Sequence, residues 1–297
     1  MPYGVGGVVE PVGLTIAVDD WAKSTRRWEA ILNEKAPITD LTPDGRKRKR
    51  FFSNGIVYMD LIEAEHEVRA GDSELVLQTK DVGARVDAIR ALGVPIEVDT
   101  ATGDARLSAE HASGTDIVFT TRRPKIAGSE KYWKLNPLPY VFDYSVKSLK
   151  ESVPIWQAIL GLNGINTPEE TDSGGQFKMH HFLVDGETHA IGLMQLRDDA
   201  GFIKRDSQGA CHEYIMATHG EGLLCVGFLF KGLSDLNEHI SRLSDEGREQ
   251  LICEAPRSYL MGENNISHPS TTGGIEVIVA RHYEGWTGDL NEFNDNP

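Results

Sequence analysis

Apolar residues recur in the same way four times along the chain: a short apolar strand, a polar residue, and then an amphipathic helix. In the third of these segments, Leu149, Val153, Trp156 and Leu160 are spaced by 4, 3 and 4 residues, which places them on one helix face. We expect Asp20, Asp81, Ser148 and Ser234 to cap the four helices, because their side-chain oxygens can accept from free backbone N–H groups. The four segments span residues 13–32, 74–93, 141–162 and 225–247.

Strand-like, turn-rich sequence follows each predicted helix. RKRKRFF and IVYMDLIEAE flank SNG, and QFKMHHFLV and THAIGLMQL flank DGE, so each pair predicts a β-hairpin. HASGTDIVFTT and HPSTTGGIEVIVARH match each other, with Asp116 aligned to Glu276. The chain therefore consists of four strand–helix–strands units arranged as two similar halves, 1–125 and 126–297.

Two motifs in the second half point to a family. VKSLKESVPIWQAILGL and HPSTTGG resemble motifs of the vicinal oxygen chelate superfamily, which includes glyoxalases, epimerases, extradiol dioxygenases and bleomycin-resistance proteins. The resemblance implies an α+β fold of four βαβββ modules that form two cup-shaped, half-barrel domains. It indicates the fold more strongly than the function, because this fold hosts many chemistries.

The resemblance also implies a divalent metal in a cup, held by His, Gln or Glu. In the second half the implied ligand positions lack suitable side chains, so we expect no metal in the C-terminal cup; they are Val141, Gly192, Cys225 and Ile278. In the first half, Asp60 and Glu74 are two oxygen ligands that suit Mg²⁺, Mn²⁺ or Ca²⁺. The alternative is that both are ordinary acids of an acidic chain.

Carboxyl groups are the candidate catalytic groups of the second cup. Strand alternation places Asp143 and Glu276 on the inward face, and a carboxyl group inside an apolar cup has a raised pKa that suits a general acid or base. His181 is the candidate proton shuttle, because only one of the adjacent His180 and His181 can face inward. The alternative is that these groups point to solvent or close structural hydrogen bonds. The expected substrate-binding residues are Tyr144, Cys225, His180, His189, His268 and Phe228.

Two further segments have alternative interpretations. Residues 197–222 form a long insertion that could cover the cup as a lid; Cys211, His212, His219 and Cys225 in this region do not have the spacing of paired zinc ligands. The run RKRKR, residues 46–50, is predicted to begin an edge strand, and could instead bind a substrate carboxylate or phosphate.

Composition limits the location and the partners. The formal net charge of −15 argues against a nucleic-acid or anionic-membrane binder, and the expected partner is a small molecule. No apolar run is long enough for a membrane span, no secretory signal is recognisable, and three cysteines suit a reducing compartment, so we expect a cytoplasmic protein. Fold relatives often pair, which suggests a homodimer.

Three functions remain open at this point. The sequence favours an enzyme, such as a lyase, an isomerase or a ring-cleaving oxygenase, that acts on a small organic or aromatic metabolite by acid–base chemistry in the C-terminal cup, with a degraded metal site. The first alternative is a metal-free protein of the bleomycin-resistance type that binds or sequesters a small molecule. The second alternative is a metal-dependent extradiol dioxygenase, for which a divalent metal would be the cofactor.

Overall fold

The computed structural model describes residues 9–32, 38–52, 58–65, 69–126, 138–166, 177–183, 190–197, 208–230, 251–258, 262–267 and 269–281. The first half contains α1 (Trp21–Leu32), α2 (Val82–Ala91), the short 3-10 helix η1 (Ala109–His111), and the strands β1 (Val9–Val18), β2 (Ile38–Leu41), β3 (Lys47–Phe51), β4 (Tyr58–Glu63), β5 (Ser73–Thr79), β6 (Glu97–Val98), β7 (Ala105–Leu107) and β8 (Thr115–Thr120). The second half contains α3 (Leu149–Leu160), α4 (Gln208–Thr218), α6 (Pro269–Thr272), and the strands β9 (Leu138–Ser145), β10 (Ile165–Asn166), β11 (Phe177–Leu183), β12 (Ala190–Leu196), β13 (Gly222–Phe230), β14 (Leu251–Ser258), β15 (Gly262–Ser267) and β16 (Glu276–Arg281).

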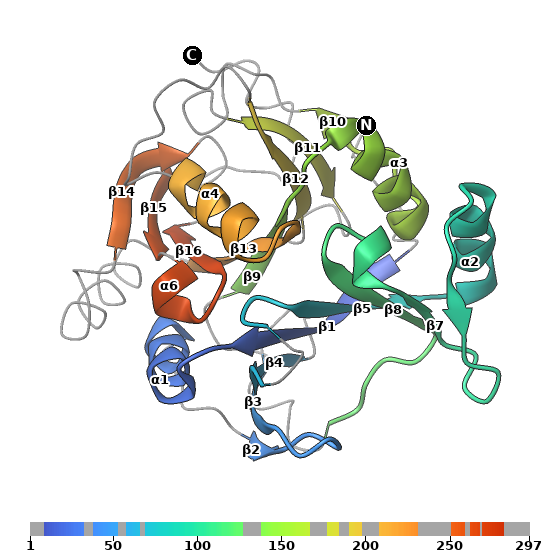
Figure 1. Ribbon diagram of the computed structural model, residues 1–297, viewed down its shortest axis with the longest axis horizontal. Helices are drawn as coiled ribbons and strands as arrows, with labels where there is room; N and C mark the ends of the chain where they lie inside the picture. The colour runs from blue at the N-terminus through green and yellow to red at the C-terminus, as the bar shows by residue number, and fades with distance from the viewer. Residues whose placement is uncertain are drawn as a thin grey trace.

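The two halves form two eight-stranded sheets of the same topology. The strand orders are β2-β3-β4-β1-β5-β8-β7-β6 and β10-β11-β12-β9-β13-β16-β15-β14. In each sheet the first strands of the two modules, β1 with β5 and β9 with β13, pair antiparallel at the centre, and both predicted hairpins are present as β3–β4 and β11–β12. This architecture confirms the α+β prediction of βαβββ modules in two half-barrels (Figure 1). The predicted fourth helix falls within residues 231–250, outside the described residues.

The helix caps only partly follow the prediction. Asp81 caps α2, since its carboxylate accepts from the backbone N–H of Ala84 at 2.9 Å. Ser148 precedes α3 but makes no side-chain cap; the amide oxygen of Gln195 instead accepts from the first helical N–H, at 2.9 Å. The predicted cap at Ser148 is therefore wrong, because a neighbouring strand supplies the acceptor. Asp20 is 3.4 Å from the N–H of Lys23, and Ser234 lies outside the described residues.

The basic run 46–50 lies on an interior strand. The prediction of an edge strand is wrong, because β2 pairs with the outer side of β3 and β4 with its inner side. Alternation along β3 separates its charges: Lys49 reaches Glu29 of α1 at 2.7 Å, whereas Arg50 reaches Asp60 on the opposite face of the sheet. The arginines of this run therefore share one face and the lysines share the other.

Two tryptophans connect the halves, which meet where α1 lies beside α6 and α2 beside α3 (Figure 1). Trp28 of α1 donates from Nε1 to the backbone oxygen of Thr272 at 2.9 Å, and Trp156 of α3 donates to the hydroxyl of Ser113 at 3.2 Å. Both indole rings are fully buried in one apolar cluster that includes residues of both sheets. The two halves therefore share a core. No helix within the described ranges has the length and apolar character that crossing a membrane requires.

A glycine permits a close backbone approach between the halves. Gly114 has φ +77°, and a Cβ atom there would lie within 2 Å of the backbone oxygen of Glu221. The left-handed conformation and the lack of a side chain both favour glycine at this position. The loop after α4 can therefore pack directly against the first half.

Candidate active site and a second polar row

A row of polar side chains crosses the second sheet on the face that points away from α3, here called the inner face. The strand register pairs His181 with Gly192, Gly192 with Asp143, Asp143 with Cys225, and Cys225 with Glu276. These residues come from β11, β12, β9, β13 and β16, five consecutive strands of the sheet. The two carboxyl groups expected to act together thus lie on β9 and β16, two strands apart, with Cys225 of β13 between them.

Glycine creates the space in the middle of this row. A Cβ atom on Gly192 would lie 2.0 Å from Oδ1 of Asp143 and 3.4 Å from Cε1 of His181. The side chains of Asp143 and His181 therefore occupy the space above Gly192. On the other side, the thiol of Cys225 donates to Oδ2 of Asp143 at 3.3 Å.

Burial controls the charge of this row. Desolvation raises the pKa of Asp143 to about 6, and the hydrogen bond from Cys225 opposes that shift. Desolvation lowers the pKa of His181 to about 4, and burial raises the pKa of the Cys225 thiol. Within the described structure, Oδ1 of Asp143 and both ring nitrogens of His181 are buried without a hydrogen-bond partner. At neutral pH the row therefore combines a neutral imidazole and a neutral thiol with a carboxyl group close to its titration point.

Helix α4, which lies within the predicted insertion 197–222, covers this row. Cys211 and Ile215 of α4 are buried in a cluster with side chains from the inner face; those sheet residues are Phe177, Met179, Met194, Leu224, Cys225 and Ile278. His212 of α4 is 3% exposed, and its Nε2 lies 3.2 Å from the backbone oxygen of Met194. Among the described residues, α4 therefore supplies apolar cover for this cup, where the sequence predicted an insertion that could act as a lid.

Three of the predicted substrate-binding residues face away from the cup. Tyr144 packs against Trp156 with ring centroids 4.5 Å apart, and Phe228 packs edge-on against Trp28 at 6.1 Å. His180 lies 2.7 Å from the side-chain oxygen of Asn166, on the same face as Phe182. Their predicted place in the cup lining is wrong, because strand alternation directs them to the outer face when Asp143, His181 and Cys225 face inward. His189 and His268 lie outside the described residues.

The metal-ligand positions that the resemblance implied do not share one row. Val141 and Ile278 both pair with Gly227, two residues along their strands from Asp143 and Glu276. A two-residue shift keeps the same face of a strand, so sequence alternation alone does not reveal it. Of the four implied positions, only Gly192 and Cys225 therefore lie in the row with Asp143 and Glu276.

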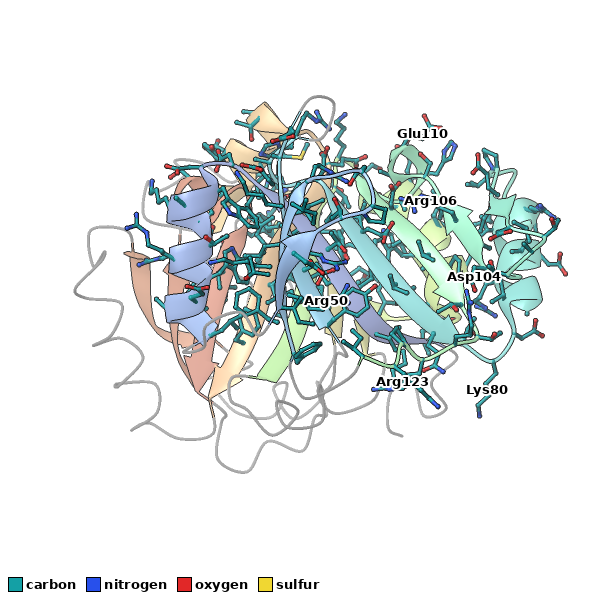
Figure 2. The ribbon with its side chains drawn as sticks, turned by 90° about the horizontal axis from the view of Figure 1, so that it is seen from below. Arg50, Lys80, Asp104, Arg106, Glu110 and Arg123 are labelled. Carbon is teal, nitrogen blue, oxygen red and sulfur yellow. The ribbon has the colours of Figure 1, made fainter. Side chains whose placement is uncertain are left out.

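The equivalent row of the first half is occupied by ion pairs. Its register joins Asp60 to Thr15, Thr15 to Glu74, and Glu74 to Asp116. Two hydrogen bonds of 2.6 Å bind Arg50 to Asp60. Arg106 of β7 binds both Glu74 and Asp116, at 2.7 and 2.6 Å. Figure 2 shows Arg50 and Arg106, which come from β3 and β7, on either side of the central strands β1 and β5.

The described donor groups do not form a metal site. Among the described residues, no group of three or more His, Cys, Asp or Glu side chains is arranged to hold a metal ion. In the first half, guanidinium groups already occupy the carboxylates of Asp60 and Glu74, the two predicted ligands. In the second half, Asp143 is bonded to a protonated thiol rather than to a thiolate. The described side chains therefore do not fit the divalent metal that the resemblance implies.

The buried pair of Arg50 and Asp60 is expected to be essential for stability. Asp60 is 3% exposed, and desolvation raises its pKa against the opposing effect of Arg50. Arg50→Gln should lower the free energy of unfolding by about 3 kcal/mol, because it leaves a buried carboxylate whose one other cationic neighbour among the described residues, Arg48, is 3.7 Å away. The double variant Arg50→Gln/Asp60→Asn should recover most of this loss in urea unfolding. A double variant as unstable as the single one would contradict this explanation.

Acid sensitivity should depend on His212, whose pKa desolvation lowers to about 4. Between pH 6.5 and 4 the unfolded chain binds a proton at this residue and the folded chain does not, so stability falls as the pH falls. In urea unfolding at several pH values, His212→Gln should reduce the loss between pH 6.5 and 4.5 by about 2 kcal/mol. Parallel stability curves for the two proteins would show that His212 is not a buried neutral group.

Comparisons with known proteins support the fold assignment. No protein-family model and no curated protein matches the chain by sequence. Among solved structures, a 4-hydroxymandelate synthase variant from Streptomyces coelicolor matches with a TM-score of 0.63 and 11% identity over 93% of this chain and 94% of its own.

Two further solved structures agree with this match. A Mn(II)-bound glyoxalase from Novosphingobium aromaticivorans matches with a TM-score of 0.57 and 14% identity over 92% of this chain and 81% of its own. An extradiol ring-cleaving dioxygenase from B. fuscum matches with a TM-score of 0.60 and 13% identity over 100% of this chain and 77% of its own. The chain therefore has the fold of the vicinal oxygen chelate superfamily, as its sequence motifs predicted.

Proposed function

We propose that this protein is an enzyme that transforms a small organic molecule by general acid–base chemistry in the C-terminal cup. The main support is Asp143, a buried carboxyl group with a pKa of about 6 and one oxygen, Oδ1, without a hydrogen-bond partner in the described part of the chain. A carboxyl group that titrates near the working pH can both accept and return a proton. A pKa that burial shifts strongly is also a recognised sign of function.

The neighbours of Asp143 suggest how the proton would move. Cys225 donates to Oδ2, which leaves Oδ1 as the oxygen that would accept a proton from the substrate. His181, neutral and on the far side of Gly192, could then donate to a substrate oxygen that gains negative charge. Glu276, two strands from Asp143, would supply the second carboxyl group of the pair. This arrangement suits proton abstraction beside a carbonyl group, as in an isomerase or lyase reaction.

The cover formed by α4 bears on two candidate functions. An enzyme would need α4 to move when the substrate enters, and its return would exclude water from the row. A metal-free sequestering protein is the competing candidate, because Cys211 and Ile215 of α4 place apolar surface directly on the inner face, where an apolar ligand could be held without reaction. The dioxygenase and glyoxalase names of the structural matches favour the enzyme, with a small, aromatic or carbonyl-bearing substrate.

Consumption of candidate substrates would separate these functions. The protein is incubated with a library of small hydroxy-ketones, keto acids and phenols, and every compound is quantified by mass spectrometry. We expect at least one compound to be converted by the wild type and by Lys80→Gln, an exposed control in the first half directly after β5, but not by Asp143→Asn or Glu276→Gln. A compound that is retained by the protein and recovered unchanged would support the sequestering function. Equal conversion by all four proteins would reject the proposed site.

A further inference from the structure

The first half contains a large cavity that the proposed chemistry does not use. Its volume is about 850 Å³, and it lies over the row of Thr15, Asp60, Glu74 and Asp116. The loop after α4 closes one side through residues 219–221, so both halves contribute to its wall. A cavity of this size is in the range of sites for small organic ligands.

Three guanidinium groups form one wall of this cavity: Arg46, Arg48 and Arg50. Each is held in the same way, with its Nε and Nη2 atoms facing a carboxylate; the acceptors are Asp44, Asp40 and Asp60, respectively. The third guanidinium nitrogen, Nη1, is consequently the donor that remains for another acceptor. In Arg48 it lies 3.7 Å from Asp60, beyond hydrogen-bond distance.

The donors that remain unused point to the chemistry of the ligand. Nη1 of Arg46 is buried and, in the part of the chain that the structure describes, has no hydrogen-bond partner. On the opposite wall, both ring nitrogens of His219 are also buried without a partner among the described residues. His219 packs over Gly71, where a Cβ atom would lie 3.2 Å from its ring. Buried polar groups normally have partners, so the Nη1 donor of Arg46 and the single N–H donor of a neutral His219 ring indicate an acceptor that the described residues do not supply.

The positions of these donors limit the size of the ligand. Arg48 pairs with Ile62 on β4, Ile62 pairs with Ala17 on β1, and Ala17 accepts from the backbone N–H of Gly71. The path from Arg48 to Gly71 crosses three backbone spacings of about 4.8 Å each (β3 to β4, β4 to β1, and β1 to Gly71), which places the backbones of the two walls about 14 Å apart. After an arginine and a histidine extend inward from the two sides, the gap that remains suits a small molecule.

We infer that this cavity is a second ligand site, which binds a small organic carboxylate between the Arg46–Arg48 wall and His219. A carboxylate is planar, and its geometry matches the N–H groups of a planar guanidinium. Charge-assisted hydrogen bonds of this kind are stronger than hydrogen bonds between neutral groups. The bound carboxylate accepts from Nη1 of Arg46 and from a ring nitrogen of His219. Because His219 directly follows α4, the ligand also contacts the segment that leads to the cover of the C-terminal cup.

Isothermal titration of the intact chain with succinate tests this inference, with neutral succinamide and inorganic phosphate as comparison probes. We expect saturable binding of succinate and no saturable binding of succinamide. Arg46→Gln should weaken succinate binding by at least about tenfold, and His219→Phe by about three- to tenfold. Arg26→Gln, which removes an exposed arginine of α1 outside this cavity, should bind like the wild type.

The outcomes that would overturn the inference are distinct. They are the absence of succinate binding at millimolar concentration, equal binding of succinate and succinamide, tighter binding of phosphate, and wild-type affinity in both Arg46→Gln and Arg46→Lys. The second substitution retains the charge but loses the planar group, so it covers the case in which Arg46→Gln does not fold. Asp143→Asn should bind succinate like the wild type, so this test is independent of the chemistry proposed for the second half.

Discussion

Replacing Asp143 by asparagine is expected to make the protein more stable and to abolish its turnover. The folded-state pKa of about 6 lies above the value of about 3.9 in an unfolded chain, so at pH 7 burial of the ionised group costs about 3 kcal/mol. The neutral amide does not bear this cost. Loss of the proton-transferring group should lower the rate by about 10²- to 10⁴-fold.

The pH dependence of this effect has a defined sign. The folded wild type binds the Asp143 proton more tightly than the unfolded chain, so its stability falls as the pH rises from about 4 to about 6. The gain of Asp143→Asn over the wild type, measured by urea unfolding, should therefore grow across this range and stay constant above it. Asp87→Asn, an exposed position on α2, is the matched control and should show no such change. A variant that is less stable than the wild type at pH 7 would contradict the assignment of a buried, costly carboxylate.

Each tryptophan that connects the halves should contribute strongly to stability. Trp28 and Trp156 are fully buried, and each donates a hydrogen bond to the opposite half. Trp28→Ala and Trp156→Ala should each lower the free energy of unfolding by about 3–5 kcal/mol, because a large cavity replaces the ring. Denaturant unfolding followed by circular dichroism measures this loss.

A conservative variant separates packing from hydrogen bonding at these positions. Trp156→Phe retains most of the apolar volume but leaves the hydroxyl of Ser113 without its donor, so it should cost about 1–2 kcal/mol. Losses of less than 1 kcal/mol in both alanine variants would show that the two halves do not depend on a shared core.

The spacing of apolar residues along the sequence predicted a large part of the fold. The steps of 3 and 4 between apolar residues located α2 and α3, and the hairpin pattern located β3–β4 and β11–β12. The short strands β2 and β10 have too few residues for a detectable alternation, and so the basic strand β3 looked like an edge when it is interior. Helix α4 was not predicted, because its apolar and polar residues do not alternate with a helical period, although Cys211 and Ile215 share its buried side.

The candidate site was only partly predictable. Alternation correctly placed Asp143 and Glu276 on one face, but it could not distinguish positions two residues apart, so the row they form with Cys225 and Gly192 required the strand register. Tyr144 and Phe228 were assigned inward as apolar residues, although their own parity relative to Asp143 and Cys225 already indicated the outer face.

The cavity of the first half was largely missed. The spacing of Arg46, Arg48 and Arg50 at every second position was the available signal, since it predicts three guanidinium groups on one face of a strand. Arg106 gave no such signal, because its pairing with Glu74 and Asp116 depends on which strands become neighbours. His219 comes from the other half of the chain, so only the packing of the two halves brings it to this cavity.

A carbon-13 NMR titration of the aspartate side-chain carboxyl groups measures the ionisation of Asp143 in the folded protein. The resonance that disappears in Asp143→Asn identifies this residue. We expect it to titrate in the wild type with a pKa of about 6, in a folded protein with α4 in place. A pKa near the ordinary value of about 3.9 would show a solvated carboxylate and would contradict acid–base chemistry at this row.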